Sequence, residues 1–161
     1  MSHIPNQIHQ TWNSALLPEQ GGTLHAAFHV ATDGMLLEAR NAERVALAVT
    51  VSRGSLVVEA PEDHIVLDVE DTYGVQFGGV HDLHITFGDF GTRIYLDGYQ
   101  AFACATNICP SKYAQAGVFH CANEAHIGVE RLECFSEAWT SERIQGSVPV
   151  PQPDIEFAAA Y

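Results

Sequence analysis

The chain has 161 residues, which predicts a single domain, and its 47% hydrophobic content excludes a fully disordered protein. Twenty acidic residues against seven basic ones give a net charge of −13 at pH 7, and Lys112 is the only lysine. Nucleic acids and anionic lipid surfaces are bound mainly through Lys and Arg that neutralise phosphate. The composition therefore predicts neither nucleic-acid nor membrane partners.

Apolar and polar residues alternate with a period of two along most of the chain, which is typical of half-buried antiparallel strands. Dipeptides that favour tight turns, such as Asp33-Gly34, Gly88-Asp89 and Asp97-Gly98, lie between or at the ends of these runs. The sequence therefore predicts an all-β protein, a two-sheet antiparallel sandwich. The alternating runs in chain order are 23–31, 45–51, 56–58, 65–69, 83–87, 93–96, 127–129 and 132–134.

Three segments depart from the alternation. Residues 103–123 alternate poorly and are predicted to be a long, ordered loop that crosses between the sheets. One short helical turn is expected around Ser141–Gln145, with Thr140 or Ser141 capping its first amides. Residues 146–161 are rich in proline and predict either an exit segment toward a following domain or an edge strand at 154–157.

The start of the chain and the cysteines indicate the cellular compartment and the redox state of the thiols. The first twelve residues contain no basic region followed by an apolar run, so the chain is expected to be cytoplasmic if Met1 is its native start, and otherwise a piece of a longer protein. Four cysteines could pair in three ways; without a signal peptide, free thiols are the default. A Cys104–Cys109 or other disulfide, and a zinc site of Cys104, Cys109, Cys121 and His120, remain as alternatives.

Two stretches of sequence, taken together, resemble a known family. The run HDLHITF at 81–87, a short turn, and RIYLDG at 93–98 resemble a strand pair of the laminin-G-like, concanavalin-A-like lectin and glucanase jelly-roll domains. The runs AHIG at 125–128, VERLECF at 129–135 and AWTSERI at 138–144 are similar to the closing pattern of that family. The resemblance covers about residues 22–145 and implies a jelly roll that fills the single domain 1–161. It also implies carbohydrate or protein recognition, because such modules are frequently appended to glycoside hydrolases and sialidases.

Catalytic chemistry is weakly indicated. Glycosidases need two carboxylates about 5–10 Å apart across a sugar site. Asp68 and Glu70 share a strand face and are the best pair, whereas Glu130 and Glu133 are expected on opposite faces. We therefore expect no catalytic residue in this chain, with a glycan hydrolase that uses Asp68 and Glu70 as the less favoured interpretation.

Metal ligands are equally sparse. His25 and His29 lie on one strand face but about 13 Å apart, too far to share one zinc ion. No cofactor is predicted, although loop carboxylates such as Asp68, Glu70, Asp71 and Asp89 could supply ligands to Ca²⁺.

Sugar binding calls for exposed aromatic rings with polar neighbours. The candidate ligand-binding residues outside the inward-facing sets are Tyr73, His84, Arg93, Tyr95, Tyr99 and Tyr113. Arg93 and Tyr95 are expected to point outward from one strand, with His84 on the next strand, so that the three cover one exposed face. Trp12 and Trp139 are expected in the core.

The function that follows is a non-catalytic, lectin-like carbohydrate-binding module of a larger glycoside-processing enzyme. A neutral oligo- or polysaccharide is favoured over sialic acid or heparin, because the six arginines are scattered. The other expected partner is an adjoining catalytic domain. The alternative function is a structural or protein-interaction sandwich that packs on a neighbouring domain or self-associates.

Overall fold

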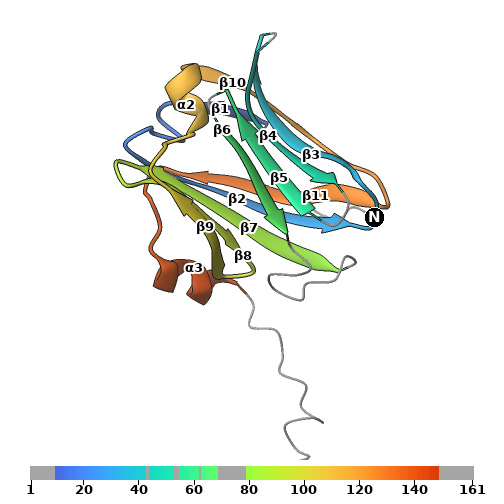
Figure 1. The fold of residues 1–161 in the computed structure, drawn as a ribbon. Helices are drawn as coiled ribbons and strands as arrows, with labels where there is room; N and C mark the ends of the chain where they lie inside the picture. Colours follow the sequence, from blue (N-terminus) through green and yellow to red (C-terminus); the bar gives the residue numbers. More distant parts are fainter. Residues whose placement is uncertain (1–9, 43, 53–54, 62, 69–78, 149–161) are drawn as a thin grey trace, which may run out of the picture.

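The computed structural model describes residues 10–42, 44–52, 55–61, 63–68 (backbone alone) and 79–148. Two antiparallel sheets face each other as a sandwich (Figure 1), which confirms the predicted fold class. One sheet has the strand order β1-β10-β3-β4-β5-β6, and the other has the order β11-β2-β7-β8-β9. The strands are β1 Thr11–Asn13, β2 Gly21–Val30, β3 Gly34–Asn41, β4 Arg44–Ser52, β5 Ser55–Ala60, β6 Asp63–Asp68, β7 Val80–Gly88, β8 Gly91–Leu96, β9 Tyr99–Cys104, β10 Ala116–Cys121 and β11 Ile127–Phe135.

The period-two alternation fills the space between the sheets. The register of β2 against β7 pairs Leu24 with Ile85 and Ala26 with Leu83, and all four side chains are buried in one core. Trp12 is 1% exposed and belongs to this core, as expected. The neighbouring positions along each strand therefore point to the outer face of the five-stranded sheet.

The turn between β8 and β9 matches its sequence. Asp97 and Gly98 have φ values of 51° and 89°, the left-handed conformation that an Asp-Gly hairpin turn requires. This turn places the Asp97 carboxylate beside β7, where it accepts a hydrogen bond from the amide of Asp82 at 2.8 Å.

The segment 103–123 crosses from one sheet to the other, as predicted, but the prediction of a long loop is wrong. It contains the end of β9, the helix α2 (Pro110–Tyr113) and the whole of β10, which pairs with β3. Small residues conceal the alternation of β10, because Gly117 and Cys121 flank the one large inward side chain, Phe119. The crossing is thus built from regular structure.

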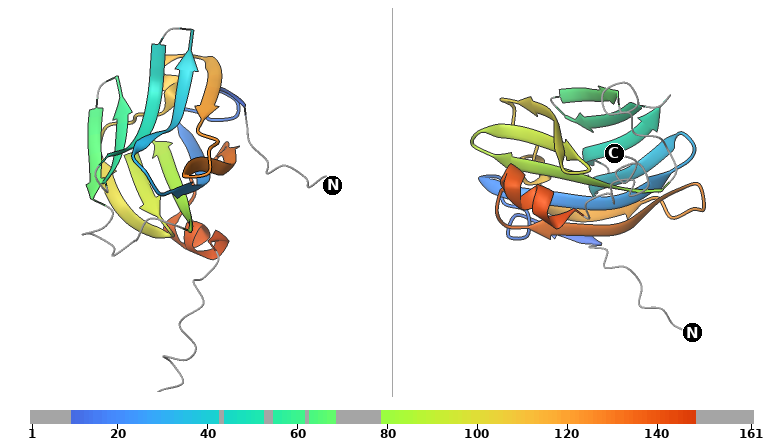
Figure 2. Two further views of the ribbon diagram at one scale, coloured as in Figure 1. Left: turned by 90° about the vertical axis from the view of Figure 1, so that its right-hand side faces the viewer. Right: turned by 90° about the horizontal axis from the view of Figure 1, so that it is seen from below.

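The predicted helical turn is present as α3 (Ser141–Ser147). The Thr140 hydroxyl caps it by accepting a hydrogen bond from the Arg143 amide at 3.2 Å. Figure 2 shows α3 against the five-stranded sheet. Within the described residues, no helix is long and apolar enough to cross a membrane. The strand expected at 154–157 lies outside the described residues.

Candidate functional site: the outer face of the five-stranded sheet

The register of the five-stranded sheet aligns polar and aromatic residues in rows across its outer face. One row joins Thr23, Thr86 and Arg93, from β2, β7 and β8. The next row joins His25, His84 and Tyr95 from the same strands. The sequence alternation had assigned His84, Arg93 and Tyr95 to one face, and the register confirms that assignment.

A covering segment, residues 136–147, lies across this face after β11. The Thr23 hydroxyl anchors the first residues of this segment: it donates a hydrogen bond to the Glu137 carbonyl at 2.7 Å and accepts one from the Trp139 amide at 2.9 Å. The Tyr95 hydroxyl and the Ser141 hydroxyl share a hydrogen bond of 3.0 Å further along. Ile144 of α3 is 0% exposed, so the segment is anchored by apolar packing as well.

This cover corrects one prediction. His84 is 1% exposed and Tyr95 is 0% exposed, so the expectation that they cover an open face together with Arg93 is wrong. The cause is long-range packing: the Trp139 ring lies 5.9 Å from the His84 ring, and Ser141 sits on Tyr95. The signal for this cover was the capped helical turn predicted around Ser141–Gln145, because Ile144 within it and Trp139 just before it are apolar and need a surface to pack on.

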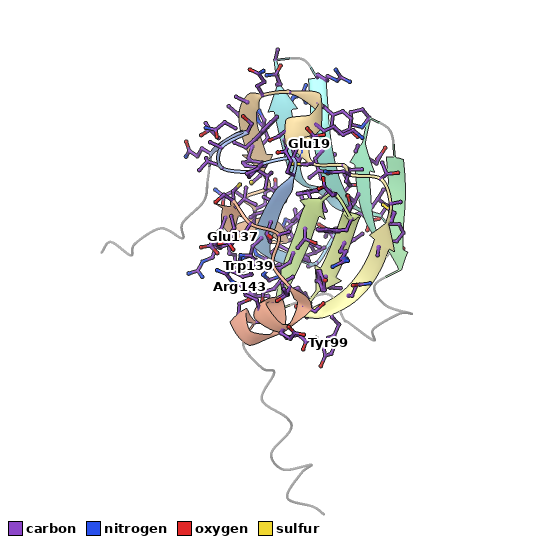
Figure 3. All side chains as sticks on the ribbon, turned by 90° about the vertical axis from the view of Figure 1, so that its left-hand side faces the viewer. Glu19, Tyr99, Glu137, Trp139 and Arg143 are labelled. Atoms are coloured by element: carbon purple, nitrogen blue, oxygen red, sulfur yellow. The ribbon has the colours of Figure 1, made fainter. Side chains whose placement is uncertain are left out.

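Trp139 is half-buried on the outer face rather than part of the sandwich core, where it was expected. Its ring packs against Phe135 with ring centroids 4.3 Å apart, and the Arg143 guanidinium lies 4.3 Å over it. Arg143 also reaches Glu137 at 3.6 Å, and Figure 3 shows these three labelled side chains gathered on one side of the molecule. The arrangement closes the covering segment onto the sheet.

Two of the expected ligand-binding residues are exposed, at opposite ends of the β8–β9 hairpin. Arg93 stacks over the Phe90 ring at 4.3 Å, near the β7–β8 turn. Tyr99, whose side chain is labelled in Figure 3, is 64% exposed near the β8–β9 turn. Arg93 pairs with Ala103, four residues from Tyr99, so the two positions are about 13 Å apart.

The last two candidates lie elsewhere. Tyr113 belongs to α2, where it packs half-buried against the core. Tyr73 lies outside the described residues.

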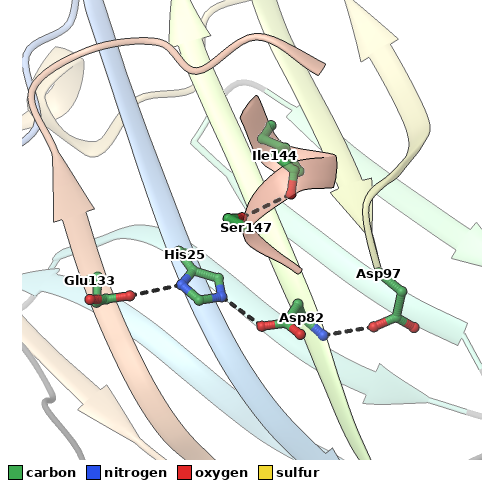
Figure 4. Close-up of polar contacts among 6 residues, drawn as sticks. All are labelled: His25, Asp82, Asp97, Glu133, Ile144 and Ser147. Carbon is green, nitrogen blue, oxygen red and sulfur yellow. Dashed lines mark hydrogen bonds and ion pairs between the residues drawn. The ribbon is translucent and has the colours of Figure 1, made fainter. Parts of the chain in front are cut away.

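His25 forms the centre of a polar network that the sequence did not reveal (Figure 4). Its Nδ1 lies 2.9 Å from Glu133 Oε1 on β11, and its Nε2 lies 2.7 Å from Asp82 Oδ1 on β7. Both ring nitrogens can donate to carboxylates only in the imidazolium form. Burial lowers the pKa of His25, but the two carboxylates outweigh burial and raise it above 6.5.

His84 has the opposite environment. Its ring stacks on that of His25, with centroids 4.2 Å apart and planes inclined by 11°. Neither ring nitrogen has a hydrogen-bond partner among the residues that the structure describes. Burial, and after it the positive charge of His25, lowers the pKa of His84 to about 3, so the ring is neutral at pH 7.

Two further histidine–carboxylate pairs flank the network. His29 lies 3.0 Å from Glu130, and His81 lies 2.8 Å from Asp97. The expectation that Glu130 and Glu133 occupy opposite faces is wrong, because β11 has an irregularity between Val129 and Arg131 that turns Glu130 to the same side as Glu133.

In the structure, none of Cys104, Cys109, Cys121 and Cys134 forms a disulfide. Burial raises the pKa of Cys109 and Cys121 to about 11 and that of Cys134 to about 12. No group of three or more His, Cys, Asp or Glu side chains is arranged to hold a metal ion within the described part of the chain. The side chains of Asp68, Glu70 and Asp71 lie outside that part.

The fold is the concanavalin-A-like β-sandwich, and comparisons with solved structures agree at that level. The chain is similar to Trypanosoma rangeli sialidase in complex with 2,3-difluoro-KDN (TM-score 0.61, 13% identity, 89% of this chain and 27% of that one). It is also similar to the binding domain of botulinum neurotoxin serotype D (TM-score 0.60, 10% identity, 84% and 38%). A third match is a botulinum neurotoxin type C structure whose description names interaction with two ganglioside molecules (TM-score 0.54, 8% identity, 92% and 37%).

These matches show the fold alone, because the sequence identities are low. The chain spans about a quarter to two fifths of the length of these proteins. No model of a protein family and no curated protein sequence matches the chain.

Proposed function

We propose that the chain is a non-catalytic, lectin-like module that binds carbohydrate, as part of a larger glycan-processing enzyme. The observation that carries the proposal is the fold. Over most of its length, this chain matches a protein described as a sialidase and another described as a neurotoxin that interacts with gangliosides. A fold hosts many activities, so the binding chemistry is argued from the exposed residues.

Tyr99 is the residue that we propose to contact the sugar. Its ring is 64% exposed and lies on β9, the edge strand of the five-stranded sheet, clear of the core. An exposed tyrosine offers a flat apolar face and a polar hydroxyl, the combination that sugar rings require. Arg93 over Phe90 at the other end of the hairpin is proposed as a separate, second contact, since the register places Arg93 on the outer face and Tyr99 opposite the inward-facing Leu96.

The charge distribution supports a neutral glycan. Arg40 pairs with Glu38 at 3.3 Å, and Arg143 pairs with Glu137 at 3.6 Å while it stacks on Trp139. These guanidinium groups already have carboxylate partners, and a sialic acid or sulfate group would have to compete with them. The net charge of −13 further disfavours an anionic ligand.

A panel of neutral and sialylated oligosaccharides tests the proposal by affinity electrophoresis and glycan array. We expect binding to at least one neutral glycan and a loss of at least tenfold, about 1.4 kcal/mol, in Tyr99→Ala. Tyr99→Phe keeps the ring and should retain most of the affinity, and Met35→Ala on the other sheet should leave it unchanged. Binding to no neutral glycan would refute the proposal, and binding to sialylated glycans alone would refute its neutral part.

A protein-interaction role is the second candidate, and one surface supports it. Val118 is 43% exposed and Met35 is 37% exposed on the outer face of the six-stranded sheet. Val118→Asp separates the two roles: it should weaken self-association or docking on a neighbouring domain, and it should leave glycan binding intact.

A further inference from the structure

His84 is an unusual residue to place beneath a tryptophan. It is 1% exposed, and neither its ring N–H nor its ring lone pair has a partner among the described residues. Buried polar atoms without partners are uncommon, and an apolar ring of the same shape would avoid them. What distinguishes histidine from such a ring is its ability to take up a proton near neutral pH.

A proton on His84 does not fit the closed arrangement. On β2 the neighbouring His25 is an imidazolium ring, stacked face to face at 4.2 Å. On β7 Asp82 is the nearest carboxylate, but its Oδ1 is already bound to His25 at 2.7 Å. The covering segment brings Trp139, whose ring lies 5.9 Å from that of His84 and has the cationic Arg143 at 4.3 Å.

The remaining elements around His25 and His84 supply no free carboxylate within the described residues that would stabilise a charged His84. Glu133 on β11 faces His25 and is bound to Nδ1 at 2.9 Å. Tyr95 on β8 lies next to His84 in the same row, and its hydroxyl is hydrogen-bonded to the Ser141 hydroxyl. A second positive charge would therefore lie against His25 with little compensation, whereas water at the ring would remove the larger cost, which is burial of the charge.

The covering segment is the element that separates these two states. Its polar attachments are the two hydrogen bonds of Thr23 and the one between Tyr95 and Ser141. Its apolar attachments are Trp139 on His84 and the buried Ile144. In the described part of the chain, no strand pairing of either sheet involves residues 136–147, so detaching this segment would expose His84 to water without breaking a strand pair.

We propose that protonation of His84 at acidic pH releases the covering segment: uptake of one proton by His84 detaches residues 136–147 and uncovers Thr23, His84 and Tyr95. The sign follows from linkage. Burial is the larger cause of the lowered pKa of His84, and opening removes it, whereas the charge of the stacked His25 acts in both forms. The open form therefore binds more protons than the closed form at acidic pH, and the open fraction rises by up to tenfold for each pH unit of acidification.

Residue-resolved amide hydrogen exchange, corrected for the intrinsic rate at each pH, tests the release. The Trp139 amide, which donates to Thr23, reports the covering segment. The Ala122 amide, which donates to the Leu36 carbonyl of β3 at 2.8 Å, reports the six-stranded sheet, away from the covering segment. From pH 6 to pH 5 we expect the protection factor of Trp139 to fall several-fold, by up to tenfold, and that of Ala122 to stay constant. Equal losses at both amides, or a constant Trp139 protection factor, would overturn the proposal.

Matched variants identify the titrating group. His84→Phe and His84→Gln each remove the proton site, so Trp139 protection should become independent of pH in whichever of them folds. Tyr95→Phe removes an attachment but keeps His84, so protection should be lower at every pH with the same dependence on pH as in the wild type. A pH dependence that persists in His84→Gln would assign the proton to another group and refute the role of His84.

Discussion

His25 offers the sharpest test of the electrostatics on the outer face. Replacing it with glutamine removes the imidazolium that joins Glu133 and Asp82, whose side chains are 22% and 17% exposed. A hydrogen bond to a charged group contributes about 1.5–3 kcal/mol, and glutamine can retain one of the two. We therefore expect His25→Gln, which loses one of the two, to lower the free energy of unfolding by about 1.5–3 kcal/mol at pH 6.5.

The loss should depend on pH in a defined direction. The folded-state pKa of His25 is raised above 6.5, so its contribution is complete below pH 6.5 and disappears as the pH rises through the raised value. The difference between wild type and His25→Gln should therefore shrink between pH 6.5 and pH 9. Ionisation of thiols in the unfolded chain at pH 9 affects both proteins equally and cancels in the difference.

Urea denaturation at the two pH values measures this difference. His120→Gln, at an exposed position on β10, is the matched control and should change stability by less than about 0.5 kcal/mol. A difference that is the same at both pH values, or larger at pH 9, would show that His25 does not act as an imidazolium between two carboxylates.

Two further predictions concern packing and the thiols. Gly117→Ala should lower the free energy of unfolding, measured by urea denaturation, by about 1–3 kcal/mol, because a Cβ there would meet the Arg40 carbonyl and the Trp12 ring. Gly146→Ala is the control: a Cβ there meets nothing within 4 Å, so the change should be neutral or slightly stabilising. Equal effects of the two substitutions would contradict the packing argument. Cys109, with its pKa raised to about 11, should react with iodoacetamide at pH 8 about a hundredfold more slowly in the native protein than in urea, and equal rates by peptide mass spectrometry would contradict its burial.

The strand pattern of this fold could be predicted because the information is local. The inward positions of β2 and β7 alternate with polar ones. Asp97 and Gly98 have the left-handed conformation of a tight turn, and they join β8 to β9 where the sequence predicted a turn. The strand β10 was missed because Gly117 and Cys121 are too small to mark an inward face. At Gly117 the space is filled by Trp12 of the neighbouring strand β1, and hydrophobic periodicity fails at such positions.

The candidate site depended on information that alternation does not contain. The positions of His84 and Tyr95 on the outer face followed from the period of two, but their burial follows from Trp139 and Ser141, whose contacts span about fifty residues of chain. The grouping of Glu130 with Glu133 required an irregularity in β11, which has no signature in the sequence. The pairing of His25 with carboxylates on two different strands required the register of both.

The burial of His84 and Tyr95 also connects the two proposals and keeps them separable. In the closed form, Tyr99 and the Phe90–Arg93 pair are the exposed aromatic contacts, and both lie outside the row that the covering segment seals. A glycan held by Tyr99 should therefore bind with the same affinity at pH 7.5 and pH 5. A glycan that needs Tyr95 should bind more tightly as the pH falls, and His84→Gln should abolish that gain. The pH dependence of affinity thus assigns the sugar to the edge strand or to the covered face, because only the covered face changes its exposure with the charge of His84.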